Sequence, residues 1–457
     1  MLDEKLSSAT RRHWQSVKSE LERHFSLLWE FSELPGMETR SAKALSDWLE
    51  LEGFSVERSP FGIPTAFTAI SGSSQGPRVA ILAEYDALPG TSNDAVPRRE
   101  RDRKRAGHAC GHNQIGPANC AAAIAASRAL NESGLNGGIL VIGCPAEEIL
   151  WGKIALLRVG AFENIDVLLT SHGDYQNGAL SRPCQSVVSG EFVFLGESGH
   201  AGSVRRQNAL DAAELAVQSI ERLRAHHFPE TAVEHILRVG GHIPNVTPDE
   251  ARLWVTSRQL NFERAREVYH FVRSVAAQSA EVCGVTFKEQ FIAGTRGYLP
   301  NDALAQVLQQ QLDSLGPPRW TAEDINWMSS LCKAIKPNEP MRLDRGLALY
   351  SDGHDAYAQD DGEVSWRVPL GRVNWAIPEQ VPLHNWAYTA LSGHPSSYAG
   401  PLMASEALAL AAVQVAVEPN IILDAKSELR QRTANIELGE PMLGAWRTLT
   451  KTPEAFW

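Results

Sequence analysis

The segment from Gly107 to Asn113 carries two side chains that bind transition metals. Cys110 and His112 stand two residues apart in it, so both can turn to one side of an extended turn. The glycine between them permits close approach of the backbone. On its own, this segment also fits a buried cysteine next to an exposed histidine.

Two adjacent carboxylates, Glu147 and Glu148, directly follow the apolar run 139–144. Carboxylates at the end of a buried strand cost free energy unless they are hydrogen-bonded or face a cation. One of them could bind a metal ion while the other acts as a general base toward water on that ion. The alternative is an exposed pair at the start of a helix, where the helix dipole favours acidic side chains.

Two further histidines complete the candidate set. His172 follows the apolar run 167–170, and His394 precedes the helix-like stretch 403–417. A lone histidine in either place is more often structural, but the repetition of such residues at strand ends favours a shared site. A mixed set of nitrogen, oxygen and sulfur ligands suits Zn²⁺, Mn²⁺ or Co²⁺ and suits Mg²⁺ or Ca²⁺ poorly. The set is Cys110, His112, Glu148, His172 and His394, enough for two ions with a shared ligand.

The elements that must position these residues alternate between buried strands and helices. The apolar patterns predict helices over 12–34, 114–131 and 154–162, and a turn followed by a helix within 34–54 that ends at Gly53. They predict buried strands over 79–83, 137–144 and 166–170. Such alternation predicts an α/β fold with a mainly parallel central sheet, whose polar strand ends form sites.

Residues 187–298 have a different pattern and predict an inserted domain. Strand, helix, two strands, helix and strand follow one another, which is the βαββαβ order of a ferredoxin-like unit. We therefore expect residues 1–186 and 299–457 to form a catalytic domain. The insert between them would serve as a lid or a dimerisation domain.

The composition restricts the possible functions. The chain has 457 residues and a formal net charge of −11, and its one short basic run lies at 98–105, which disfavours nucleic-acid binding. No apolar stretch approaches the roughly 20 residues that cross a bilayer, and the first residues lack an apolar signal region. Six scattered cysteines do not form a disulfide scaffold. We expect a cytoplasmic protein that binds neither nucleic acid nor membrane.

The motifs EYDALPG, GHACGHN, PAEE, SHGD and SGHPSS resemble, in order and spacing, those of the M20 metallopeptidase and amidohydrolase family. The cysteine in HACGH is similar to that of its aminoacylase-like branch. The segments GYLPN, DDGEVSW and PLHNW look most similar to the p-aminobenzoyl-glutamate hydrolase B-subunit type. The resemblance covers nearly the whole chain and implies a zinc-peptidase-like catalytic domain with an inserted lid.

The resemblance also implies roles for the residues that match. The five candidate ligands would hold one or two Mn²⁺ or Zn²⁺ ions, and Glu147 would be the general base. Asp86 matches the aspartate of the family's HxD motif and would support the ligands. Glu84 stands where that motif has its histidine, and we do not expect it to be a ligand.

Three residues of the insert match family positions that act on the substrate. His200 would reach the active site of a partner in a homodimer and stabilise the oxyanion, although the proline that usually follows is absent here (GHAGSVRR). Asn245 and Arg258 would bind a substrate carboxylate. A homologous second subunit is a further possible partner. His384, in PLHNW, could line the pocket or lie at the surface.

The expected activity is hydrolysis of the amide C–N bond of a small N-acyl or aroyl amino acid, such as p-aminobenzoyl-glutamate. Two alternatives keep the fold: an aromatic amine hydrolase acting on an aminobenzoate such as 5-nitroanthranilate, and a dipeptidase. A non-catalytic subunit is a third alternative, which the complete ligand set disfavours. The other five cysteines are expected to be buried thiols.

Overall fold

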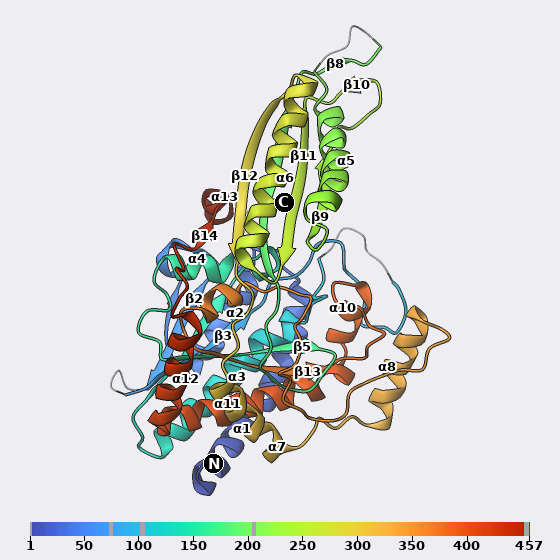
Figure 1. The fold of residues 1–457 in the computed structure, drawn as a ribbon. Coiled ribbons are helices and arrows are strands. Elements are labelled where there is room, and N and C mark those ends of the chain that lie inside the picture. Colours follow the sequence, from blue (N-terminus) through green and yellow to red (C-terminus); the bar gives the residue numbers. More distant parts are fainter. Residues whose placement is uncertain (1, 73–75, 101–105, 203–206, 452–456) are drawn as a thin grey trace.

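The computed structural model describes residues 2–72, 76–100, 106–202, 207–451 and 457. It has a broad α/β body and a narrower domain that projects from it (Figure 1). Residues 101–105 of the basic run and residues 203–206 after His200 lie outside the described residues.

A seven-stranded sheet forms the centre of the body. Its order is β1 (Ser55–Arg58), β2 (Phe67–Gly72), β4 (Gly138–Cys144), β3 (Arg78–Glu84), β5 (Val167–Asp174), β13 (Leu370–Ala376) and β6 (Gly178–Leu180). The four strands β4, β3, β5 and β13 run parallel to one another, whereas the outer pairings are antiparallel. Because parallel strands end at the same edge, residues after β3, β4 and β5 meet there.

Two apolar layers cover this sheet. On one face, Val79 and Ile81 pack with α3 (His112–Glu132) and α11 (Ala399–Val417), over which α1 (Glu4–Phe31) lies, beside α2 (Thr39–Leu51) and α7 (Asp302–Leu315). On the other face, Ala80 and Leu82 pack with α4 (Gly152–Arg158) and the region of α9 (Asp361–Ser365). The alternation along β3 follows from the two-residue period of a strand.

The remaining helices lie around this body: α8 (Ala322–Ile335), α10 (Trp386–Ser392), α12 (Pro419–Thr433) and α13 (Trp446–Lys451). Contrary to the expectation from the sequence, the chain does contain such an apolar stretch: within the described residues, α11 is the one helix long and apolar enough to cross a membrane. In the structure, 83% of that apolar window is buried inside the protein. It is therefore a core helix of the fold.

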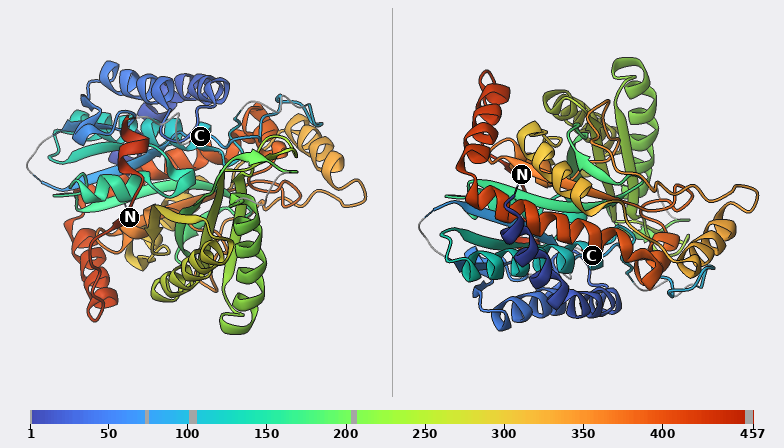
Figure 2. Two further views of the ribbon diagram at one scale, coloured as in Figure 1. Left: turned by 90° about the horizontal axis from the view of Figure 1, so that it is seen from above. Right: turned by 90° about the horizontal axis from the view of Figure 1, so that it is seen from below.

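The projecting domain has the expected βαββαβ order. Its elements are β7 (Ser186–Leu195), α5 (Ala209–His227), β9 (Ala232–Val239), β11 (Glu250–Gln259), α6 (Phe262–Cys283) and β12 (Thr286–Thr295). The antiparallel sheet has the order β14-β12-β7-β11-β9, where β14 (Met442–Leu443) comes from the C-terminal part of the chain. Helices α5 and α6 pack against it side by side (Figure 2). The fold class predicted from the sequence is confirmed.

Two predicted helices have different bounds in the structure. The first begins at Glu4 instead of residue 12, because the Asp3 carboxylate caps it by accepting from the backbone N–H of Lys5 and Leu6. The helix predicted over 154–162 is instead the shorter α4, which ends at Arg158.

Candidate metal centre and active site

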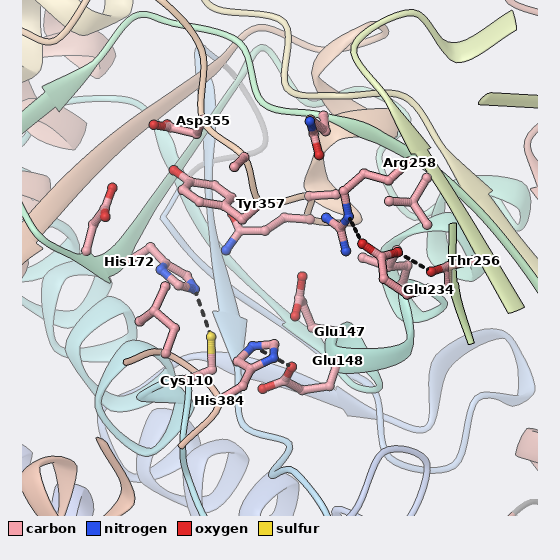
Figure 3. Close-up of a pocket in the computed structure, with 18 of the residues that line it drawn as sticks. Cys110, Glu147, Glu148, His172, Glu234, Thr256, Arg258, Asp355, Tyr357 and His384 are labelled. Carbon is pink, nitrogen blue, oxygen red and sulfur yellow. Dashed lines mark hydrogen bonds and ion pairs between the residues drawn. The ribbon is translucent and has the colours of Figure 1, made fainter. Parts of the chain in front are cut away.

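Cys110 and His112 lie where the chain enters α3. Gly111 between them has φ of 79°, and a Cβ there would lie 2.6 Å from the hydroxyl of Tyr388, so glycine alone fits this turn. The turn brings the sulfur of Cys110 to 3.5 Å from Nε2 of His172, at the end of β5 (Figure 3). All three potential ligands are buried.

Asp86 orients His112, as expected of a supporting residue. Its Oδ1 accepts a hydrogen bond from Nδ1 of His112 at 2.8 Å, and its Oδ2 accepts from the backbone N–H of Glu148 at 2.9 Å. The bond to Nδ1 fixes the ring so that Nε2 faces the carboxylates. Asp86 thus links the start of α3, which carries His112, to the turn after β4, which carries Glu148.

Glu147 and Glu148 begin the single-turn helix η2 (Glu147–Ile149) after β4. Nε2 of His112 lies 3.8 Å from Oε2 of Glu147 and 4.0 Å from Oε1 of Glu148. The other carboxylate oxygen of Glu148 lies 3.4 Å from Nε2 of His384. Glu148 therefore lies between the two histidines, and Glu147 lies beside it.

Two groups of potential ligands share one cysteine. Cys110, His112 and His172 each place a ligand atom within 4.8 Å of the others, and so do Cys110, Glu148 and His384. Together these residues could hold one or two divalent ions, with Cys110 common to both groups.

The structure does not place His394 with the other candidate ligands. Its ring stacks on Trp327 at a centroid distance of 4.0 Å, and its Nδ1 accepts from the backbone N–H of Ser396 as the cap of η3 (Pro395–Ser397). His394 belongs to neither group of potential ligands. His384 instead lies with Cys110 and Glu148 and is the histidine that could complete the ligand set. It has a φ of 56° in the loop before α10, which directs its ring toward these two residues.

Burial sets the protonation of this cluster. It raises the pKa of Glu148 to about 8 and that of Glu147 well above its ordinary value, where the nearby Glu84 carboxylate adds to the effect. Burial also lowers the pKa of His172 to about 3. The side chain of His384 is 55% exposed, and partial desolvation together with the charges of His112 and Arg258 lowers its pKa to about 4. For His112, the Asp86 carboxylate outweighs burial and raises the pKa.

Several buried polar atoms of the cluster lack a hydrogen-bond partner. They are Oε2 of Glu84, Nε2 of His112, Oε1 of Glu147 and Oε1 of Glu148. Buried acceptors that face one another without donors are costly. A cation held by Nε2 of His112 and Oε1 of Glu148 would satisfy these two atoms and offset the negative charge of the other two carboxylates, so the residues fit a divalent metal ion.

A cavity of about 1290 Å³ opens above the cluster. Its floor contains Cys110, Glu147 and His172, and β9 and β11 of the inserted domain form one wall (Figure 3). Arg258 on that wall lies 3.2 Å from Oε1 of Glu234.

A second arginine in the cavity, Arg182, was not identified from the sequence. It pairs with Asp355 at 2.5 Å. Among the described lining residues, four acids besides the Glu147–Glu148 pair line the cavity: Asp174, Glu234, Asp355 and Glu379. Glu234 and Asp355 pair with the two arginines, whereas Glu379 pairs with Arg342.

His200 and Asn245 lie at the far tip of the inserted domain. His200 belongs to β8 (Gly199–His200), which pairs with β10 (Val246–Thr247), and the N–H of Ala201 donates to the carbonyl of Asn245 at 2.9 Å. Both side chains are exposed, and neither lines the cavity of its own chain. Figure 1 shows this tip pointing away from the body.

Comparison with known proteins agrees with this architecture. Residues 185–281 match the peptidase dimerisation domain of the M20 type. The chain is 28% identical over 439 residues to one of the subunits of p-aminobenzoyl-glutamate hydrolase from Escherichia coli, covering 89% of this chain and 91% of that one. It is 29% identical to the mouse Xaa-Arg dipeptidase, over 88% of this chain and 87% of that one.

A solved structure shares the fold. A dinuclear metal-binding peptidase of the M20 family from Bacillus subtilis has a TM-score of 0.56 and 21% identity, over 88% of this chain and 99% of that one. A metal-dependent amidohydrolase is the class of enzyme that this fold and these relatives define. The chain belongs to the M20 family.

Proposed function

We propose that the protein hydrolyses the amide C–N bond of a small N-acyl or aroyl amino acid with the help of two divalent ions. The observation that carries this proposal is the pair of ligand groups that share Cys110, with Glu147 beside them. Mn²⁺ and Zn²⁺ both suit such a mixed ligand set.

Five residues would hold the ions: Cys110, His112, Glu148, His172 and His384. When bound, the ions would polarise the amide carbonyl and lower the pKa of a water molecule. Glu147 would take the proton of the attacking water and then deliver it to the leaving amine. Burial raises the pKa of its carboxyl, which suits a group that must hold a proton between these two steps.

The tip of the inserted domain would act on the partner subunit. His200 would donate a hydrogen bond to the oxyanion in the partner's site, and Asn245 beside it would contact the substrate. We propose a homodimer that forms through the edge of the inserted domain's sheet. Strand β9 is the edge strand beside β11, and its Ile236 is 60% exposed, so a second copy could pair along it. A homologous second subunit is the alternative, which coexpression would reveal.

A dipeptidase that releases a basic residue is a second candidate. Arg258 is the proposed carboxylate anchor, but in this structure it forms an ion pair with Glu234. Arg182 likewise forms an ion pair with Asp355. A glutamate product would bring two carboxylates into a cavity whose lining acids outnumber its arginines. A guanidinium or ammonium group would meet the acids with favourable charge. The similarity to the Xaa-Arg dipeptidase supports this candidate.

The six cysteines support a place in the cytoplasm. All of them are free thiols, and Cys110 must remain reduced to act as a ligand. Reducing compartments preserve such thiols.

One substrate screen tests these assignments. Protein loaded with Mn²⁺ or with Zn²⁺ would be assayed on aroyl-glutamates, N-acyl amino acids, dipeptides ending in arginine or glutamate, and aminobenzoates. We expect an amino acid as a product. Release of ammonia from an aminobenzoate without any amino acid would instead indicate aromatic amine hydrolysis, and inactivity on every amide would contradict the proposed function.

A further inference from the structure

A fully buried lysine lies beneath the proposed metal centre. Nζ of Lys153 lies 2.7 Å from Oε1 of Glu84 and 2.5 Å from Oδ1 of Asp360, and all three side chains are almost completely buried. Oδ2 of Asp360 also accepts a hydrogen bond from the backbone N–H of Lys153 at 2.7 Å. Lys153 thus ties β3 to the start of α9.

This network reaches the candidate ligands through Glu84. Its second oxygen, Oε2, lies 3.5 Å from Nε2 of His112, and neither atom has a hydrogen-bond partner. Two ligands about 2.0–2.2 Å from one tetrahedral ion lie roughly 3.4 Å apart. Glu84 is therefore at least as close to His112 as Glu147 and Glu148 are, although it belongs to neither group that shares Cys110.

We propose that Glu84 is a positioning residue of the metal centre, held beside His112 by Lys153 and Asp360. Its free oxygen places negative charge next to the ion that His112 would hold and strengthens binding there. This inference rests on the proposed function, because it assumes that His112 is a ligand.

The charges of the network explain why a lysine is buried here. Glu84 and Asp360 would repel each other and the Glu147–Glu148 pair without a cation between them. Lys153 supplies that cation at one oxygen of Glu84 and leaves the other oxygen directed at His112.

The test is metal binding by Glu84→Gln, which keeps the shape of the side chain and removes its charge. Calorimetric titration of the metal-free protein with Mn²⁺, without substrate, would measure affinity and stoichiometry. We expect the affinity for one of the two ions to fall about 10–100-fold, the usual cost of losing an outer partner of a metal ligand. Asp360→Asn should weaken binding in the same direction by a smaller factor.

Glu363→Gln is the matched control. Glu363 lies on α9, close to Asp360 in the chain, and it forms an equally buried ion pair with Arg296 at 2.6 Å. The contacts described for this pair include none of the proposed ligands. Its loss should lower the melting temperature and change Mn²⁺ affinity less than about threefold.

The absorption spectrum of the Co²⁺-loaded protein provides a second measurement of metal binding. In Co²⁺-loaded Glu84→Gln, the charge-transfer band from the Cys110 thiolate should persist, while the second equivalent of Co²⁺ binds more weakly than in the wild type. Unchanged affinity in Glu84→Gln, or an equal loss in Glu84→Gln and Glu363→Gln, would overturn the proposal. If the wild type binds neither Mn²⁺ nor Zn²⁺, the proposed function itself fails.

Discussion

The floor of the cavity and the tip of the inserted domain carry the proposed chemistry in opposite settings. On the floor, Cys110, His112 and His172 are buried and fixed by strand ends and by Asp86. At the tip, His200 and Asn245 are exposed on a short two-stranded ribbon. The floor brings its groups together within one chain, whereas these two side chains of the tip line no part of that chain's own cavity.

This difference indicates which part of the mechanism each region can serve. Buried ligands hold an ion because their geometry is set before the ion arrives. An exposed donor at the tip becomes useful only where another surface covers it and excludes water. The floor would therefore determine metal binding, and the tip would determine turnover in the partner.

Loss of Glu147 should have the largest effect. Glu147→Gln would leave the five proposed ligands in place but remove the group that moves the proton. We expect kcat to fall about 10³-fold or more, with metal content unchanged by elemental analysis. A Glu147→Gln enzyme that keeps its ions and turns over at the wild-type rate would contradict the assignment of the general base.

Loss of His200 should reduce turnover next most strongly. His200→Ala would remove the proposed oxyanion donor, and we expect kcat to fall about 10²–10³-fold with Mn²⁺ affinity unchanged. The unchanged affinity follows from the exposed place of His200 at the tip, away from the ligands.

Mixing two inactive variants would show whether the tip acts across subunits. In a heterodimer of His200→Ala and Glu147→Gln, one site combines an intact Glu147 with an intact His200 from the partner. Dissociation and random reassociation should restore about a quarter of the wild-type activity. If the mixture stays inactive although heterodimers form, His200 does not act in trans.

The sequence predicted the floor well because strand ends are local features. The apolar runs before Glu147 and His172 identify buried strands, and their parallel arrangement brings the following residues to one edge of the sheet. The short spacing between Cys110 and His112 is similarly local. The supporting role expected of Asp86 came from the family resemblance, and in the structure its carboxylate accepts from His112, 26 residues along the chain.

The misplaced histidine shows where such reasoning fails. His384 and His394 stand ten residues apart, on either side of α10, and each is followed by a helix or a helical turn. Which of them faces Cys110 depends on the positive φ of His384 and on the stacking of His394 with Trp327, and both are tertiary effects. Lys153 and Asp360 were missed because their partners are distant in the chain, although a lone lysine in the apolar segment 149–157 was an available signal.

Metal affinity of single variants would show whether His384 or His394 is a ligand. His384→Ala should weaken binding of one ion about 10–100-fold, because its ring is one of the proposed ligands. His394→Ala should leave affinity within about twofold of the wild type and instead lower the melting temperature, since it loses the stack on Trp327. The reverse pattern in a Mn²⁺ titration would restore His394 as the ligand.

The pH dependence of metal uptake requires no substitution and tests the floor of the cavity alone. Burial raises the pKa of Glu148 to about 8 in the metal-free protein, so below that pH this ligand must lose a proton before it can bind an ion. His172 and His384 contribute no such cost near neutrality, because their pKa values are lowered to about 3 and 4. His112, whose pKa the Asp86 carboxylate raises, and the Cys110 thiol, whose pKa burial raises, must each also lose a proton to act as ligands.

The apparent Mn²⁺ affinity should therefore fall about tenfold for each pH unit below 8 and for each proton displaced, and binding should release protons into weak buffer. His200→Ala should follow the same curve as the wild type, because its imidazole lies at the tip and not among the ligands. A curve that changes with His200 would mean that the tip also contributes to metal binding. Affinity independent of pH between 6 and 8 would contradict this prediction, because none of the proposed ligands would then displace a proton in that range.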